Sequence, residues 1–93
     1  LEVFREAADA VATYRHVREA AALKGALCDA AREYVRLAHP QYRAGSINYI
    51  DVLDAQRRYF DAQIGLSNAV RDEHLALVGL YKALGGGWQT GAE

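Results

Sequence analysis

The amino-acid sequence predicts an all-α fold, a long antiparallel helical hairpin with coiled-coil-like packing. Two observations lead to this prediction. Apolar residues recur at alternating spacings of three and four through most of the 93 residues, which is the repeat of helices that pack side by side. Between two such stretches lies one short segment, residues 42–55, in which helix-ending and helix-starting residues follow each other. We therefore expect two helices joined by one turn.

The first helix is expected from about residue 2 to residue 39 or 44. One apolar line along it is interrupted only by Lys24. This line comprises Val3, Ala7, Ala10, Tyr14, Val17, Ala21, Cys28, Ala31, Val35, Ala38 and Tyr42. A second line beside it comprises Ala20, Leu23, Leu27, Ala30, Tyr34 and Leu37. Two adjacent lines indicate neighbours on two sides of the helix. Because Pro40 lacks a backbone donor, we expect a kink there or a helix that stops near His39.

The turn of the predicted hairpin covers residues 43–48. Gly45 can adopt the left-handed conformation that ends a helix, because it has no Cβ atom. Asn48 is a suitable N-cap for the next helix, and Asp51 places a negative charge in its first turn. These local signals predict where the chain reverses.

The second helix is expected from about residue 49 to residue 84, with three lines at the same spacing. The first is the most apolar and comprises Val52, Ala55, Tyr59, Ala62, Leu66, Ala69, Glu73, Ala76, Leu80 and Ala83. The second is mixed and comprises Leu53, Arg57, Phe60, Ile64, Ser67, Arg71, His74, Val78 and Tyr81. The third is polar and mostly acidic: Asp51, Asp54, Arg58, Asp61, Gly65, Asn68 and Asp72. Three glycines, 85–87, should end this helix, so the hairpin domain covers residues 1–88 and residues 89–93 form a disordered tail.

Composition and motifs exclude several classes of function. A net charge of −1 gives no basic excess to neutralise phosphates, so no nucleic-acid partner is expected. The single cysteine, Cys28, cannot form an internal disulfide. The three histidines are scattered without helical pairing, and no nucleophile or phosphate-binding motif is present. We therefore expect no metal, no cofactor and no enzymatic activity. The sequence contains no run of about eighteen apolar residues, so no transmembrane helix is expected.

The two helices carry more apolar surface than one hairpin can bury. A two-helix hairpin has little interior, since each helix covers only one side of the other. We expect the remaining lines to pack against other helices, from a longer chain or from other copies. The sequence begins within the apolar pattern, without a start methionine, which suggests a fragment of a longer protein. Such a fragment alone should oligomerise through its apolar lines.

Two carboxylates near the turn, Asp51 and Asp54, are the candidate functional residues. They lie three apart and so share a face of the second helix. In a single chain they are a favourable charge pair at a helix N-terminus. In a symmetric ring of helix ends they would form stacked rings of negative charge that attract cations. The polar line through Asp61 and Asp72 is likewise either a solvated face or the lining of a pore.

Three ordered motifs give the chain a resemblance to a known family. They are Tyr42-Arg43-Ala44-Gly45, Asp51-Val52-Leu53-Asp54-Ala55-Gln56 and Leu80-Tyr81-Lys82-Ala83-Leu84-Gly85-Gly86-Gly87-Trp88. From about Phe4 to Trp88, the chain resembles the C-terminal part of TolC-like outer-membrane efflux proteins, the outer-membrane factor family. Within that family it is most similar to the lipoprotein branch that serves multidrug efflux pumps of the resistance–nodulation–division type.

The resemblance implies a passive export duct and its assembly. The intact protein would be a homotrimer in the outer membrane of a Gram-negative bacterium, and this chain would be one hairpin of its periplasmic helical tunnel. The hairpin would include the periplasmic entrance of that tunnel. The implied partners are a periplasmic adaptor protein and an inner-membrane efflux transporter. The alternative is a stand-alone helical hairpin that acts as a scaffold or interaction module.

The resemblance also implies roles for residues of the turn. Asp51 and Asp54 match residues that ring the pore constriction. Tyr42 matches a residue that links neighbouring hairpins in the closed state. The region that contacts the adaptor is matched by Arg43, Ala44, Gly45 and Ser46.

The chain departs from the family pattern at two positions. Some members have an arginine where Ile47 stands, and that arginine forms links of the closed state. Pro40 is the second departure, and it is expected to tilt the turn.

Overall fold

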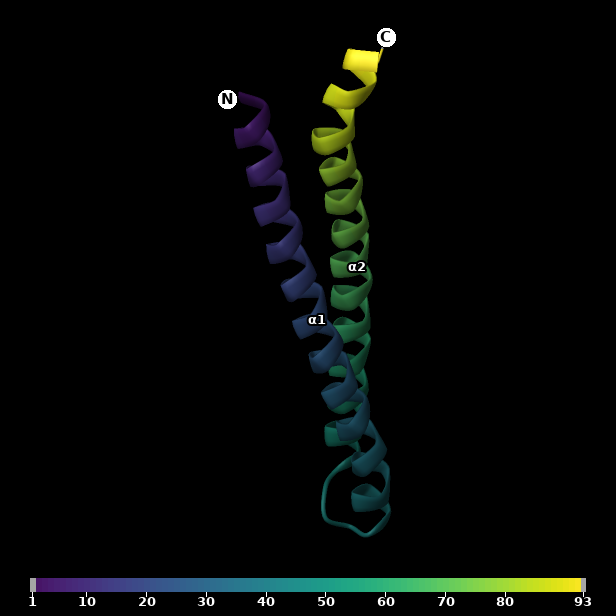
Figure 1. Ribbon diagram of the computed structural model, residues 1–93. Coiled ribbons are helices and arrows are strands. Elements are labelled where there is room, and N and C mark those ends of the chain that lie inside the picture. The colour runs from purple at the N-terminus through teal and green to yellow at the C-terminus, as the bar shows by residue number, and fades with distance from the viewer. Residues whose placement is uncertain (1, 93) are drawn as a thin grey trace. The chain divides into compact units, whose positions relative to one another are not determined.

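The computed structural model describes the backbone of residues 2–92 and the side chains of residues 2–85. Two helices, α1 (Glu2–Arg43) and α2 (Tyr49–Ala92), account for almost all of these residues (Figure 1). The described part of the chain contains no strand. The all-α prediction is therefore confirmed. Over the same part of the chain, neither helix contains a segment sufficiently long and apolar to cross a bilayer.

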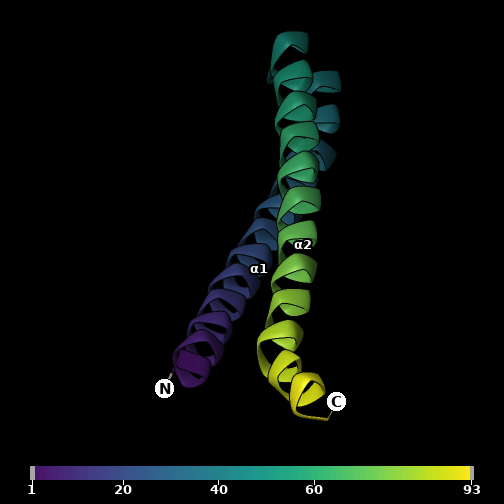
Figure 2. The ribbon, with the colours of Figure 1, turned by 90° about the horizontal axis from the view of Figure 1, so that it is seen from above.

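The chain divides into two compact units. The first, which we call the turn unit, is Ala22–Asn68 and holds the end of α1, the turn and the start of α2. The second, the terminal unit, combines Leu1–Ala21 with Ala69–Glu93. Within the turn unit the two helical segments run antiparallel and side by side in both ribbon views (Figures 1 and 2). The turn unit is therefore a helical hairpin.

Pro40 lies inside α1 without ending it. The helix continues to Arg43, so it ends close to the later of the two expected ends, residue 44, and passes the earlier one, His39. The reason is local, because proline lacks only its own N–H donor. Its carbonyl still accepts a hydrogen bond from the N–H of Ala44 at 2.9 Å. Helical hydrogen bonding therefore resumes on the C-terminal side of the proline.

The end of the second helix also differs from the prediction. The sequence predicts an end at residue 84 and a disordered tail at 89–93, whereas α2 continues to Ala92. Glycine in a helix costs about 1 kcal/mol per residue but does not forbid the conformation. The preceding turns supply the helix nucleus, so each further residue adds only a propagation step. Glu93 lies outside the described residues.

Burial in the turn unit follows the first apolar line of each helix. On α1, Cys28 and Ala38 are buried, and on α2, Val52 and Ala55 are buried. The line shifts by one residue at the predicted interruption, where Lys24 is exposed and Gly25 is partly buried. Gly25, which has no side chain, faces Leu66, whose Cδ1 lies 3.9 Å from the position that a Cβ would take. The methylene chain of Lys24 lies against Gly65 of α2, with its Cδ 3.8 Å from the corresponding position.

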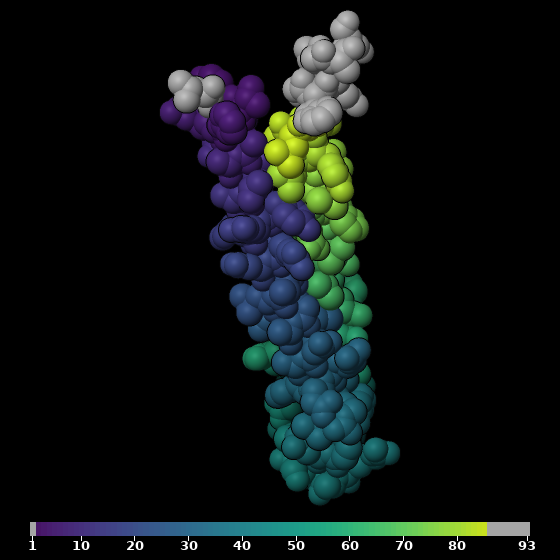
Figure 3. Space-filling view, in the orientation of Figure 1, coloured from purple at the N-terminus to yellow at the C-terminus, as the bar shows by residue number. Residues whose placement is uncertain are grey.

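The best-packed contact of the turn unit lies next to the turn. Ala38, Val52 and Ala55 form a cluster with exposed fractions of 2 %, 1 % and 1 %. Val35 and Ile47 pack against it and are partly buried. Small side chains at these positions allow the two backbones to approach closely. The space-filling view shows side chains covering this end of the turn unit (Figure 3).

The second lines of both helices remain exposed, as the sequence predicts for a hairpin that cannot cover them. In the turn unit, the exposed large apolar residues include Leu23, Leu27, Tyr34, Leu37, Leu53, Phe60 and Ile64. In the terminal unit, Ala21 is buried, whereas Leu75, Val78, Tyr81 and Leu84 are exposed. In each unit, a single chain therefore leaves large apolar side chains exposed to solvent.

Replacing Val52 with alanine should lower the free energy of unfolding by about 2 kcal/mol, because the substitution removes buried methyl groups and leaves a cavity. Ile50, two residues away, is 75 % exposed, so Ile50→Ala should change stability by less than about 0.5 kcal/mol. Urea unfolding of the chain, followed by circular dichroism at one fixed concentration, compares the two variants. Equal effects would show that the Val52 contact does not stabilise the hairpin.

Candidate functional site

The candidate site is the turn and the first three turns of α2. At the end of α1, the N–H of Gly45 donates to the carbonyl of Tyr42 at 3.0 Å. The N–H of Ser46 donates to the carbonyl of Gln41 at 2.8 Å. These two bonds, with Gly45 at a φ of 83°, form a Schellman motif, in which a left-handed residue directs the chain away from the helix axis. The predicted role of Gly45 is confirmed.

The start of α2 is fixed by a reciprocal contact between Asn48 and Asp51. The N–H of Asp51 donates to the carbonyl of Asn48 at 3.0 Å. The carboxylate of Asp51 in turn accepts a hydrogen bond from the N–H of Asn48 at 3.1 Å. This second bond is the one that the acidic residue makes in a capping box. Asp51 is thereby held against the turn, and its negative charge lies at the positive end of the helix dipole.

Two tyrosines face each other across the turn. The ring centroids of Tyr42, at the end of α1, and Tyr49, at the start of α2, are 5.4 Å apart and the rings are tilted by 57°. This tilted arrangement is one that aromatic pairs favour. Both side chains remain substantially exposed. Tyr42 therefore has a partner within its own hairpin.

Asp54 forms ion pairs with two arginines of the following turn. Its Oδ1 accepts a hydrogen bond from Nη2 of Arg57 at 2.9 Å, and its Oδ2 accepts one from Nε of Arg58, also at 2.9 Å. Arg57 extends the network to Asp61, with 3.5 Å between Nη1 and Oδ2. All of these contacts join residues three or four apart, which are neighbours on a helix surface. Asp54 thus carries its own counter-ions.

These arginines alter the ionisation of Asp54. The hydrogen bond from Arg57, together with the positive charges of Arg58 and Arg57, holds the pKa of the Asp54 carboxyl below its usual value. In the folded chain the carboxylate form is therefore favoured. Among the residues that the structure describes, Asp51 takes part in no ion pair. The two candidate carboxylates consequently have different surroundings.

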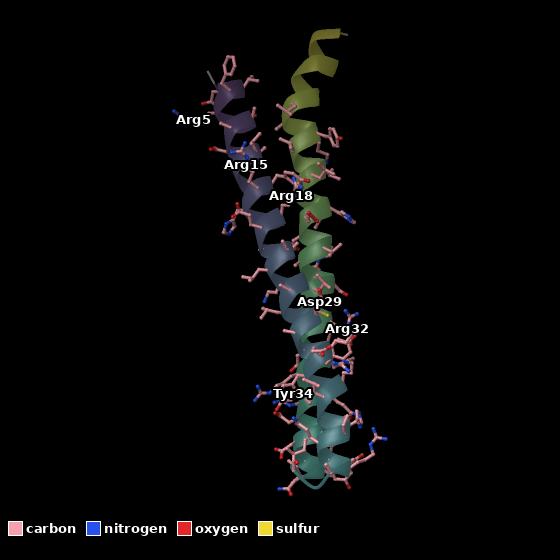
Figure 4. The ribbon with its side chains drawn as sticks, turned by 60° about the horizontal axis from the view of Figure 1, so that its bottom comes forward. Arg5, Arg15, Arg18, Asp29, Arg32 and Tyr34 are labelled. Atoms are coloured by element: carbon pink, nitrogen blue, oxygen red, sulfur yellow. The ribbon has the colours of Figure 1, made fainter. Side chains whose placement is uncertain are left out.

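The end of α1 carries similar pairs. Nη2 of Arg32 donates to Asp29 at 3.2 Å, and both residues project from α1 in Figure 4. Arg36 binds Glu33 through two hydrogen bonds, and these lower the pKa of the Glu33 carboxyl. Exposed pairs of this kind contribute little to stability. They show that ion pairs between residues three apart occur on α1 as well as on α2.

The site residues predicted from the sequence are neighbours along the chain, but in the structure their side chains contact different partners. Arg43 is the last residue of α1, and residues 44–46 lie in the exposed turn. Asp51 and Asp54 occupy the first two turns of α2. Ile47 packs against the core and is partly buried. Sequence reasoning missed the pairing of Asp54 with Arg57 and Arg58, although their spacings of three and four carry that signal. Among the described residues, no group of three or more metal-binding side chains comes together.

The fold and the site together define a class of protein. Its members are helical hairpins with exposed apolar lines and with charged residues beside the turn. The sequence pattern of the outer membrane efflux protein family matches residues 1–86 of the chain. The chain belongs to this family of outer membrane efflux proteins. No solved structure matches it.

Individual relatives agree with this assignment. The chain is 39 % identical over 88 residues to the outer membrane protein OprJ of Pseudomonas aeruginosa, covering 95 % of this chain and 18 % of OprJ. It is 41 % identical over 87 residues to the solvent efflux pump outer membrane protein SrpC of Pseudomonas putida, covering 94 % and 18 %. The toluene efflux pump outer membrane protein TtgC of Pseudomonas putida is 40 % identical over 90 residues, with 95 % and 19 % covered. The chain thus spans less than a fifth of each relative.

Replacing Gly45 with alanine should destabilise the turn by about 1–2 kcal/mol, because an L-residue is strained at this positive φ. No atom lies within 4 Å of the position that a Cβ would take at Gly45 or at the helical Gly79, so neither substitution causes a clash. Gly79→Ala should instead stabilise α2 by about 0.5–1 kcal/mol. Thermal unfolding of both variants measures the difference. If Gly45→Ala were as stable as the unchanged chain, the left-handed conformation of residue 45 would be contradicted.

The Asp54 carboxyl should titrate below a normal aspartate in the folded chain, because Arg57 and Arg58 favour its charged form. A depressed folded-state pKa contributes stability above the unfolded-state pKa, and that stability is lost as the pH falls through the folded value. Carboxyl carbon chemical shifts followed by NMR from pH 7 to pH 2 measure the titration. In Arg57→Gln/Arg58→Gln, the Asp54 pKa should return toward that of a normal aspartate. An unchanged pKa in that variant would contradict the pairing.

Proposed function

We propose that this chain forms one helical hairpin of a passive export duct, the outer-membrane channel of a tripartite efflux pump. Membership of the outer membrane efflux protein family over residues 1–86 carries the proposal. The relatives OprJ, SrpC and TtgC are outer membrane proteins, and two of the three names refer to efflux pumps. The turn unit lies at the periplasmic entrance in this proposal.

The exposed apolar lines support an assembly of several hairpins. Leu23 is 63 % exposed, and Leu27, Tyr34 and Leu37 of the same line are 51 %, 55 % and 47 % exposed. Neighbouring helices in a tunnel would bury them and gain about 25 cal/mol for each Å² removed from water. A homotrimer in the outer membrane, with this hairpin in the periplasm, provides such neighbours. A periplasmic adaptor protein and an inner-membrane transporter complete the pump.

Within that assembly, the residues of the turn take separate roles. Asp51 and Asp54 line the pore constriction, where copies of the same carboxylates meet around the symmetry axis. Residues 43–46, at the end of α1 and in the exposed turn, contact the adaptor. Tyr42 contacts a neighbouring hairpin in the closed state. Its exposed ring, already packed against Tyr49 on one side, supports this last role because another surface remains for a second partner.

A finer placement within the family follows from the motifs of the sequence. The turn motif, the aspartate motif and the glycine-rich motif with Trp88 follow one another in this order, and this order resembles that of the C-terminal part of the family. We place the chain there, as a fragment of a protein of the multidrug efflux lipoprotein branch. The short coverage of the relatives agrees with a fragment.

Replacing Asp51 and Asp54 together with alanine in the intact protein should weaken block of the channel by multivalent cations about tenfold or more. The reason is that the substitutions remove the negative charge that attracts cations into the constriction. Single-channel conductance in planar bilayers measures the block. Asp29→Ala, which removes a paired carboxylate from α1, is the matched control and should leave it unchanged. Undiminished block in the double variant would place the constriction elsewhere, and a protein that forms no channel would favour the scaffold function.

A further inference from the structure

Lys24 is the charged residue that interrupts the first apolar line of α1, and its side chain crosses to α2. Its Cδ lies 3.8 Å from the position that a Cβ would take at Gly65. Because Gly65 has no side chain, the methylene stem of Lys24 lies close to the backbone of α2, while its charged end stays in solvent. The ammonium nitrogen is two bonds beyond Cδ, and Lys24 is exposed. A positive charge from α1 is therefore placed beside α2.

This charge lies on the polar line of α2. In the turn unit, that line comprises Asp51, Asp54, Arg58, Asp61, Gly65 and Asn68. Asp61, one helical turn from Gly65, already contacts Arg57, with 3.5 Å between Oδ2 and Nη1. Lys24 itself takes part in none of the ion pairs between the residues that the structure describes. The positive charge at the level of Gly65 thus has no carboxylate paired with it.

Lys24 is also separate from the two aspartates proposed for the constriction. At a rise of about 1.5 Å per residue, Gly65 lies about 20 Å along α2 from Asp51. Charges in solvent are screened over about 10 Å at 0.1 M salt. The lysine therefore acts on a passing solute independently of the entrance carboxylates.

We propose that Lys24 is a selectivity-determining residue of the export duct, where its positive charge favours the passage of anionic over cationic solutes. The inference rests on the proposed function, because Gly65 shares one line of α2 with Asp51 and Asp54, and these two are proposed to face the pore. Copies of Lys24 around a symmetry axis form a ring of positive charge, and rings of lysine select anions in other pores. Gly65 is a positioning residue, since it leaves room for the lysine stem.

The test uses the intact protein in planar bilayers and a gradient of potassium chloride, in which the reversal potential gives the permeability ratio of potassium to chloride. In Lys24→Gln this ratio should rise about twofold or more at about 0.05 M salt, and the rise should shrink at about 1 M salt because the charge is screened. Lys24→Arg keeps the charge and should match the unchanged protein. Arg36, which Glu33 holds on α1 itself, provides the matched control: Arg36→Gln removes an equal charge and should leave the ratio unchanged.

A second experiment changes the charge on a channel that is already assembled. With Cys28 replaced by alanine, the Lys24→Cys protein is treated with methanethiosulfonate reagents that attach either a trimethylammonium or a sulfonate group to the thiol. The positive group should lower the potassium-to-chloride ratio toward that of the unchanged protein, and the negative group should raise it. The same treatment of Arg36→Cys should change the ratio in neither direction.

The outcomes separate this inference from the proposed function. An unchanged ratio in Lys24→Gln, or an equal rise in Arg36→Gln, would overturn the inference while the export duct still stands. If Lys24→Arg behaved like Lys24→Gln, the lysine would act through its shape rather than its charge, which also overturns it. If the unchanged protein formed no conducting channel, the proposed function would fail, and this inference with it.

Discussion

The packing of Ala38 against Val52 and Ala55 is the contact on which the turn unit depends. These side chains are almost completely buried, and they are small, so the backbones of α1 and α2 lie close together beside the turn. A short turn can join the helices only if their axes are close at that point. The Schellman motif at Gly45 and the cap of Asn48 by Asp51 then fix the direction in which the chain leaves one helix and begins the next. Ile47 fills the remaining space.

The apolar contact face also determines where the charges lie. Because the first line of each helix is mostly apolar, most charged side chains lie on the exposed lines. There they pair with neighbours three or four residues away, as Asp54 does with Arg57 and Arg58. Asp51 instead binds the backbone of the turn. Asp51, which we propose to line the pore, thus also holds the backbone of the turn that we propose to contact the adaptor.

The sequence predicted the main features of the fold because those features depend on local residues. The line of three-and-four spacings identified the buried faces, and Gly45 identified the reversal. The boundaries were less predictable, because a helix that is already formed tolerates unfavourable residues. α1 therefore includes Pro40, and α2 passes through the three glycines to Ala92.

The candidate site was predictable in its residues but not in their partners. Asp51 and Asp54 were identified from their shared face and from the family resemblance. Which carboxylate binds a backbone N–H and which binds arginine depends on side-chain rotamers, which a spacing does not specify. The contact between Tyr42 and Tyr49 likewise requires the exact path of the turn. These details decide the electrostatics of the site, and they become visible only in three dimensions.

The central claim is that turns from separate copies of this chain meet around a common axis. Cross-linking in the intact protein tests it most directly. With buried Cys28 replaced by alanine, a cysteine introduced by Asp54→Cys should form disulfide-linked dimers of subunits under mild oxidation, because equivalent positions around a narrow axis come within disulfide range. A cysteine introduced by Asp29→Cys on α1 should not. If the Asp54→Cys protein remained monomeric under denaturing electrophoresis after oxidation, the turns would not converge and the account of a shared entrance would be contradicted.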